Sequence, residues 1–474
     1  MALIGVAVVM AALVAARMLF GPFRFGPLSV TTPLNPEGFF GLAVTILLCT
    51  GAAVDFPVSK SSRWSLMVVG LGVVVIGMIA LRRALGIYFL SDDFILVKIG
   101  EGWNTAAFRY SITHGGGDGF FRPLGYASFA LDAAWGGRNS QWWHATSLAI
   151  HCANAVLVLL AAKRLGASVL AAGFAGALFA VHGIHPEAVV WIAGRFDLVA
   201  AFFLLAGFLL FTIATEHHSG RLHIAALACF AVAALSKESA FVFPLLVAGY
   251  ALAKRQPLKP AVWYFALAAI LFAYRWSLFG GIGGYINPST GRPAALSLGL
   301  GSTLKAVAVR VWTSLYFPLN WSGEASLPLA LLAVAYMVAL TWLALRSKSS
   351  SLLFPVAAGI LVSVIPVLSL LAGSPALAGS RVLYLPSVWF AIFLAIAVDG
   401  VPGRARYGLA TMVLLFQLAA LQHNLGFWEA ASAQVKAACA TGSPSLPASI
   451  DGVPALANGR QECIEIAHNR FNLP

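Results

Sequence analysis

The sequence predicts an all-α membrane protein with many transmembrane helices. Its 474 residues are 60% hydrophobic and only 10% charged, and the mean hydropathy is +0.86. Soluble domains carry about 25% charged residues. Long apolar stretches recur along the chain, which excludes a single membrane anchor, and they lack the alternating hydrophobicity of β-barrel strands.

Each span is predicted from an apolar run, because about 20 such residues cross a bilayer as a helix and about thirteen runs are present. The predicted spans lie near residues 1–20, 38–55, 64–81, 145–162, 168–182, 197–214, 222–236, 240–254, 261–279, 327–345, 352–371, 382–398 and 407–425. The first run lacks a charged segment before it, so we expect a retained helix and not a cleaved signal peptide.

Short basic loops predict the orientation, since cytoplasmic loops carry an excess of Lys and Arg. Loops such as Lys163–Arg164 and Arg404–Arg406 fall on one face, which places the N-terminus in the cytoplasm and the C-terminus outside. Arg82–Arg83 lies at the external end of a predicted span and argues against this orientation, but a larger number of basic loops supports it. The net charge of +13 includes many basic residues on the external face. Those residues favour anionic phosphates as partners over nucleic acid, since no basic soluble domain is predicted.

Two segments are too charged to span and are expected to form amphipathic helices on the external membrane surface. They are residues 91–143 and 280–326. The chain then divides into two N-terminal spans (1–63), a membrane core (64–426) and a small external tail (427–474). Cys439 and Cys463 both lie in this tail, where an oxidising compartment would allow a disulfide.

The most unusual feature is the acidic pair Asp92–Asp93 in SDDF, directly after the apolar run Leu66–Leu90. An ionised carboxylate in hydrocarbon costs on the order of 3 kcal/mol by insertion scales, so the pair must face water, a cavity or a cation. Taken alone, the pair favours the simpler interpretation that it marks only the start of a loop.

Three more charged clusters fall at external span ends. They are His182–Leu198 (HGIHPEAVVWIAGRFDL), Lys237–Glu238, and Arg381–Ser387 (RVLYLPS). Each alone has a structural interpretation, as a helix cap, a solvated ion pair or a lipid-headgroup anchor. Their recurrence on one face around the acidic pair indicates a functional site, because ionisable groups at membrane depth are functional candidates.

These motifs resemble the membrane core of the TMTC family of O-mannosyltransferases and its bacterial relatives. The matching positions are Asp92–Asp93, Phe121–Leu124 (FRPL), His182–Leu198, Lys237–Glu238 and Arg381–Ser387, in the same order. The resemblance implies a GT-C-like helix bundle in a bacterial inner membrane with its active site on the periplasmic face. It also implies a glycosyltransferase that uses a polyprenyl-phosphate-linked sugar and inverts the anomeric carbon.

The sequence departs from the family at several points. Gly183 and Pro186 stand where Pro and Thr are usual, and Ser380 stands where an acid is common. No tetratricopeptide repeats follow the membrane core. The acceptor therefore stays open between a protein Ser/Thr and a lipid-linked glycan or envelope polymer.

The resemblance also implies roles for single residues. Asp92 would be the general base on the acceptor hydroxyl, and Asp93 would orient it or share a divalent metal, Mg or Mn. Lys237 and Arg381 would stabilise the leaving phosphate. The other expected substrate-binding residues are Arg122, Arg195, Glu238, Tyr384, His182, His185 and Glu187. The candidate metal ligands are Asp93, His185 and Glu187.

The main alternative is a transporter or flippase of lipid-linked or anionic substrates. It predicts charges near the bilayer midplane and two related halves, whereas these charges fall at span ends and no internal repeat is evident. A non-catalytic scaffold is a further alternative, but it would leave the clustered acids and bases without a role.

Overall fold

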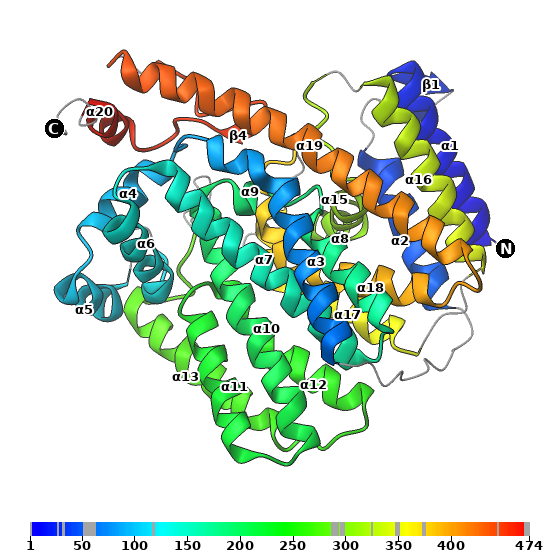
Figure 1. The fold of residues 1–474 in the computed structure, drawn as a ribbon, viewed down its shortest axis with the longest axis horizontal. Helices are drawn as coiled ribbons and strands as arrows, with labels where there is room; N and C mark the ends of the chain where they lie inside the picture. Colours follow the sequence, from blue (N-terminus) through cyan, green and yellow to red (C-terminus); the bar gives the residue numbers. More distant parts are fainter. Residues whose placement is uncertain are drawn as a thin grey trace. The chain divides into compact units, whose positions relative to one another are not determined.

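The described part of the chain is almost entirely helical. The computed structural model describes residues 2–25, 28–30, 34–50, 63–115, 119–285, 293, 299–323, 326–346, 351–371, 376–442 and 445–468. Within these ranges the sheets are two short antiparallel hairpins, β1 (Phe23–Phe25) with β2 (Leu28–Val30) and β3 (Ser449–Ile450) with β4 (Val453–Pro454). Figure 1 shows the course of the helices along the chain.

Nine helices in the described ranges are long and apolar enough to cross a membrane. They are α1 (Ala2–Phe20), α3 with η1 (Arg63–Gly86), α7 (Ser140–Leu165), η2 with α10 (Ile192–Glu216), α13 (Ala261–Phe279), α16 (Leu327–Arg346), α17 with η6 (Leu353–Leu370), η7 with α18 (Ser380–Asp399) and α19 (Ala405–Ala440). The shorter apolar helices are α2 (Leu34–Cys49), α8 (Val169–Ala180), α11 (Gly220–Ala234) and η3 with α12 (Glu238–Ala253).

Every predicted span overlaps one of these helices, so the all-α polytopic membrane fold is confirmed. The number that cross the bilayer stays a prediction, because the shorter helices fall below the length of a full span. Residues 51–55 of the predicted span 38–55 lie outside the described residues.

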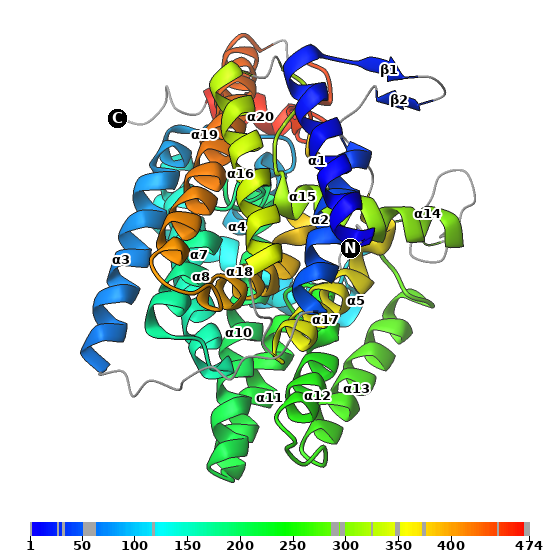
Figure 2. The same cartoon turned by 90° about the vertical axis from the view of Figure 1, so that its right-hand side faces the viewer.

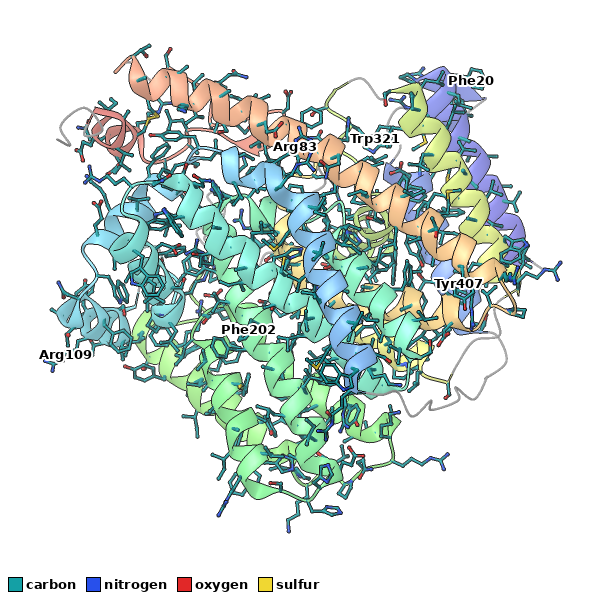
Figure 3. The ribbon with its side chains drawn as sticks, viewed as in Figure 1. Phe20, Arg83, Arg109, Phe202, Trp321 and Tyr407 are labelled. Carbon is teal, nitrogen blue, oxygen red and sulfur yellow. A yellow bond between two sulfur atoms is a disulfide. The ribbon has the colours of Figure 1, made fainter. Side chains whose placement is uncertain are left out.

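The chain folds as two compact units. Unit 1 comprises residues 1–80, 155–184 and 299–424. In this unit α1 packs along α2 and α16, and Figure 2 shows these helices side by side. The two N-terminal spans are therefore part of the packing of unit 1. The aromatic ring of Phe20, labelled in Figure 3 at the end of α1, is 81% exposed.

The predicted surface segment 280–326 contributes a continuous helical run to unit 1. It is made of α14 (Leu300–Lys305), the π-helical turn η5 (Ala306–Val311) and α15 (Trp312–Tyr316). Residues 286–292 and 294–298 lie outside the described residues.

The helix α2 packs against this run so closely that a Cβ on Gly38 would overlap the Val309 carbonyl group. Val309, Trp312 and Tyr316 are buried. The helix α2 therefore covers this part of the run, and the place of the segment on the external membrane surface stays a prediction. A sequence pattern shows that a helix has an apolar face but not what covers it.

The helix α18 lies in the interior of unit 1. It is apolar on all sides and buried along nearly its whole length, as expected of a helix with no polar face. It packs against α8 and α17. The turn η7 (Ser380–Leu383) precedes it, so the predicted RVLYLPS motif starts a buried helix.

Unit 2 comprises residues 81–154, 185–298 and 425–474. Its helix α10 (Arg195–Glu216) packs along α11, while α4 (Asp93–Glu101) and α5 (Thr105–His114) pack against α6 (Pro123–Gly136). The predicted surface segment 91–143 thus forms short helices (Figure 1). The side chain of Arg109 on α5 is exposed to the outside (Figure 3).

The C-terminal part of unit 2 differs from the expected tail. The helix α19 continues to Ala440, so the predicted boundary at residue 427 falls inside a helix. Hydropathy detects where the apolar run ends, whereas a helix continues through polar residues of good propensity. Arg83 Nε donates to Glu429 Oε1 at 2.7 Å and joins η1 (Arg82–Gly86) to α19 (Figure 3).

The structure contains a disulfide between Cys439 and Cys463, a pairing that the sequence left open. It joins the end of α19 to α20 (Arg460–His468). Alkylation of the denatured protein without reductant should modify the three cysteines that are free in the structure, Cys49, Cys152 and Cys229. Reduction should raise the number to all five cysteines of the chain. Mass spectrometry checks this result, and five modified cysteines before reduction would contradict the disulfide.

Candidate functional site

The two acids of SDDF have different surroundings in unit 2. Asp93 is fully buried and accepts hydrogen bonds from the backbone N–H groups of Leu90 (3.0 Å, to Oδ2) and Ala193 (3.1 Å, to Oδ1). Asp92 is only partly buried, and its Oδ1 accepts a hydrogen bond from Asn458 Nδ2 at 2.6 Å. Asp92 is therefore the more exposed acid of the pair.

Asp93 joins two motifs that lie about one hundred residues apart in the chain. Its bond to Ala193 fixes the turn η2 (Ile192–Gly194), and Trp191 Nε1 reinforces the joint by donating to the Leu90 carbonyl at 3.2 Å. Burial raises the pKa of the Asp93 carboxyl well above its usual value, against the lowering effect of the two N–H donors. Asp93 therefore suits a structural role better than proton abstraction.

Arg195 is fully buried at the start of α10, and its donors are directed at protein groups. The guanidinium forms an ion pair with Asp132 from α6, and it donates to the Trp143 carbonyl at 2.6 Å and to Ser147 Oγ at 3.2 Å. It also lies over the Phe129 ring, 5.1 Å from the centroid. A phosphate would have to displace Asp132 to bind here, so we interpret Arg195 as structural.

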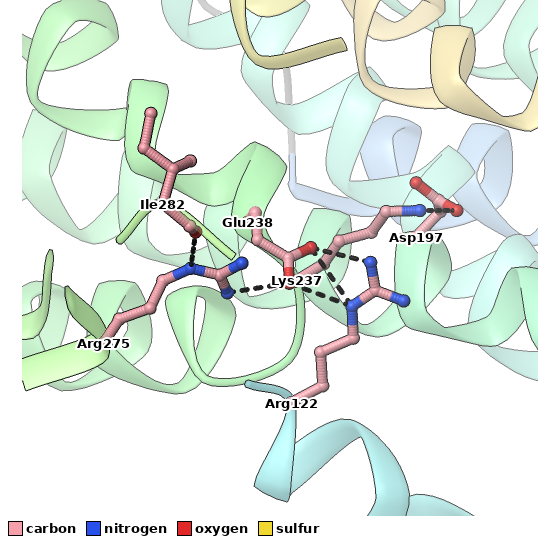
Figure 4. Close-up of polar contacts among 6 residues, drawn as sticks. All are labelled: Arg122, Asp197, Lys237, Glu238, Arg275 and Ile282. Carbon is pink, nitrogen blue, oxygen red and sulfur yellow. Dashed lines mark hydrogen bonds and ion pairs between the residues drawn. The ribbon is translucent and has the colours of Figure 1, made fainter. Parts of the chain in front are cut away.

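Lys237 and Glu238 belong to two neighbouring ion pairs (Figure 4). Lys237 Nζ pairs with Asp197, and both side chains are buried. Glu238 accepts from Arg122 Nη2 at 2.8 Å and from Arg275 Nη1 at 3.0 Å. The FRPL motif, the GRFDL motif and the Lys–Glu pair are thus brought together in one unit, as predicted from their shared face.

This cluster carries an excess positive charge. Three cations, Arg122, Lys237 and Arg275, face two carboxylates, Asp197 and Glu238, which leaves a formal charge of 3 − 2 = +1. Arg122 lies over the Phe120 ring at 4.0 Å, and its side chain is 12% exposed. Within the described residues no hydrogen bond involves its Nη1. The cluster can therefore attract an anion through a guanidinium that is already held in place.

The histidine motif is divided between the units. In unit 2, His185 precedes α9 (Pro186–Val189), and its ring lies edge-on to that of His151 with the ring centroids 4.9 Å apart. Glu187 is buried in the first turn of α9. In unit 1, His182 is buried, and its Nδ1 accepts a hydrogen bond from the Ile184 N–H at 3.3 Å.

The candidate metal ligands do not form a recognisable metal site. Among the described residues, no group of three or more His, Cys, Asp or Glu side chains could hold a metal ion. Both oxygens of Asp93 already accept backbone N–H groups. Asp93 therefore does not fit as a ligand of Mg or Mn, and metal binding through His185 and Glu187 stays a prediction.

Arg381 and Tyr384 lie in unit 1. Arg381 is part of the turn η7, whose first residue Ser380 donates its hydroxyl to the Ile184 carbonyl at 3.3 Å. The buried ring of Tyr384 packs against that of Phe179, with the ring centroids 5.2 Å apart. The His182–Ile184 stretch and the RVLYLPS motif are thus held together within unit 1, whereas the meeting of Arg381 with Asp92 stays a prediction.

Sequence reasoning missed four residues of these networks: Asp132, Asp197 as the partner of Lys237, Arg275 and Asn458. Asp132 and Arg275 are charged residues within apolar stretches. Because a charge in such surroundings needs a partner, the sequence already indicated that each forms an ion pair. Asn458 carried no signal, because an asparagine among Gly and Pro residues is typical of an ordinary turn.

Comparison with known proteins shows short similarities. The chain is 44% identical to the protein O-mannosyl-transferase Tmtc2 of Drosophila melanogaster over 90 residues, which is 19% of this chain and 10% of that protein. For tmtc2 of Xenopus laevis the identity is 32% over 144 residues, which is 28% of this chain and 17% of that protein. For human TMTC2 the identity is 38% over 98 residues, which is 21% of this chain and 12% of that protein. Over these stretches the chain is similar to TMTC protein O-mannosyl-transferases.

The matches cover less than a fifth of the length of these TMTC proteins. No family model matches the chain. Among solved structures, the chain is similar to the Archaeoglobus fulgidus oligosaccharyltransferase AglB in complex with an inhibitory peptide and a dolichol-phosphate, with a TM-score of 0.47, 15% identity and coverage of 81% of this chain and 58% of AglB. For the apo form of the Archaeoglobus fulgidus oligosaccharyltransferase the TM-score is 0.46 and the identity 13%, with coverage of 86% of this chain and 60% of that chain.

Proposed function

We propose that this protein is a membrane glycosyltransferase that moves a sugar from a polyprenyl-phosphate donor to an acceptor hydroxyl. The similarity to TMTC protein O-mannosyl-transferases supports sugar transfer. The observation that carries the proposal is the hydrogen bond from Ala193 to Asp93, because it joins the acidic turn to the histidine-motif segment, and the neighbouring Asp92 is only partly buried. Transfer takes place on the external face of a bacterial inner membrane.

In the proposed reaction Asp92 accepts the proton of the acceptor hydroxyl. The hydroxyl oxygen forms a bond to the anomeric carbon as the bond from that carbon to the phosphate oxygen breaks, and the electron pair of the broken bond stays on the phosphate. Attack from the side opposite the phosphate inverts the anomeric carbon. Negative charge grows on the leaving phosphate, so fixed cations lower the barrier.

Lys237 and Arg122 of unit 2 supply positive charge to the phosphate, and Arg381 of unit 1 stays a prediction from the sequence. Asp197 holds the Lys237 ammonium as a point charge, and Glu238 holds the guanidinium of Arg122 (Figure 4). Such preorganised groups need no rearrangement when charge develops. A guanidinium can also bind two phosphate oxygens at once.

A reconstituted assay tests this function. Purified protein in vesicles receives a radiolabelled sugar on a polyprenyl phosphate, together with extracted envelope material and a Ser/Thr-rich peptide as acceptors. We expect label to move to one acceptor only when the protein is present. If no donor of this class gives transfer, the proposal fails, and movement of the intact lipid-linked sugar across the vesicle would favour the transporter instead.

Alanine at Lys237 or Arg381 should weaken binding of the polyprenyl-phosphate donor by about tenfold each, since each loses a charge-assisted contact to phosphate. Binding is measured with a fluorescent donor in detergent micelles. The double variant Lys237→Ala/Asp197→Ala avoids leaving Asp197 unpaired, and Arg109→Ala on α5 is the matched control. Wild-type affinity in both single variants would remove these residues from the phosphate site.

A further inference from the structure

We propose that Asn458 is a positioning residue for Asp92 and that the C-terminal segment 453–468, here named the clasp, holds it in place. This inference rests on the proposed function, because it takes Asp92 as the general base. The clasp contains β4 and α20 and lies in the same unit as the SDDF turn.

Backbone contacts fix the clasp to the SDDF turn. The N–H of Ser91 donates to the Ala455 carbonyl at 2.8 Å, and Ala455 is fully buried. Gly459 has a φ of +74°, and a Cβ there would lie 2.9 Å from Phe94 Cβ and 3.0 Å from the Ser91 carbonyl oxygen. This approach is therefore open only to glycine, and it places the preceding residue, Asn458, over Asp92.

Ion pairs and a disulfide anchor the clasp at both ends of the acidic turn. Lys98 on α4 pairs with Glu465 at 2.7 Å and with Glu462 at 3.8 Å, both from α20. The Cys439–Cys463 disulfide ties α20 to the end of α19.

The helix α19 is in turn held to the residues that precede SDDF. Arg83 pairs with Glu429, and the N–H of Tyr88 donates to Ser432 Oγ at 2.7 Å. The clasp and the acidic turn are thus connected on both sides, which restricts how far either can move.

The contact between Asn458 and Asp92 is asymmetric. Asn458 Nδ2 donates to Oδ1 of Asp92 at 2.6 Å, while no hydrogen bond to Oδ2 is present within the described residues. An N–H donor that bonds one carboxylate oxygen fixes the orientation of the group. One oxygen is therefore held while the other is left to accept the proton of the acceptor hydroxyl.

Packing does not account for this asparagine. Its side chain is exposed, and the burial of the clasp comes from other residues, such as Leu456, Cys463 and Ile466. An exposed hydrogen bond adds little to stability. The contact matters for the position of Asp92 much more than for the docking of the clasp.

The test compares transfer by the full-length protein and its Asn458 variants in vesicles. In Asn458→Ala and in the isosteric Asn458→Asp, kcat should fall by about tenfold or more while KM for the donor stays unchanged, because the lost contact orients only the base. Gln461→Ala is the matched control, since Gln461 bonds to Glu465 on α20 and not to Asp92. It should keep wild-type kcat.

Hydrogen exchange at the Ser91 amide separates positioning from docking, because that amide bonds to the clasp. Exchange should stay at the wild-type rate in Asn458→Ala and rise in Cys439→Ser/Cys463→Ser. If Asp92→Asn inactivates the protein but Asn458→Ala keeps the wild-type kcat, this inference is overturned and the proposed function still stands. Faster Ser91 exchange in Asn458→Ala would overturn it too, by showing a docking role. Absence of transfer by the wild-type protein with any polyprenyl-phosphate donor would instead overturn the proposed function.

Discussion

Replacing Asp92 by asparagine should lower glycosyl transfer by about 10³-fold, within the range that a general base contributes. The amide has nearly the same shape as the carboxylate, so the turn and the bond from Ala193 to the neighbouring Asp93 should persist. It cannot take the proton of the acceptor hydroxyl at neutral pH. Transfer of labelled sugar in vesicles measures the effect, and donor binding should stay near the wild-type value.

Asp451→Asn is the matched control for that experiment. Asp451 is an exposed acid with a φ of 49° between β3 and β4, and asparagine tolerates this conformation well. The same chemical change there should leave transfer unchanged. If Asp92→Asn transfers sugar at the wild-type rate, Asp92 is not the base.

Replacing Arg195 by methionine should lower the free energy of unfolding by about 3–5 kcal/mol, the cost of leaving a buried charge without its partner. The carboxyl group of Asp132, 5% exposed, would lose its guanidinium partner in the interior. Thermal or denaturant unfolding in detergent measures the change. Arg109→Met, at an exposed position on α5 (Figure 3), should stay within about 0.5 kcal/mol of wild type.

The double variant Arg195→Met/Asp132→Leu identifies the cause. Replacing both charges of a buried pair by apolar groups is often neutral, so most of the lost stability should return. A different result would support the phosphate-binding role expected from the sequence: Arg195→Met with unchanged stability but weaker donor binding.

The membrane class and the positions of the helices were predictable from the sequence. Whether a stretch of about 20 residues prefers hydrocarbon depends on its own side chains, which is a local property. The predicted spans accordingly overlap apolar helices. The sequence allowed a disulfide, because only Cys439 and Cys463 lie outside the apolar runs, but the structure was needed to establish it. The grouping of FRPL, GRFDL and the Lys–Glu pair followed from their shared face.

The partner of each charge was decided by the tertiary structure. Arg195 was a candidate for phosphate, but the packing of α6 beside α10 supplies Asp132. The acids Asp92 and Asp93 are neighbours in sequence, yet one is partly exposed and the other is buried against η2. A charge attracts any opposite charge within reach. Only the packing of helices distant in sequence determines which partner is within reach and which carboxylate remains open to a substrate.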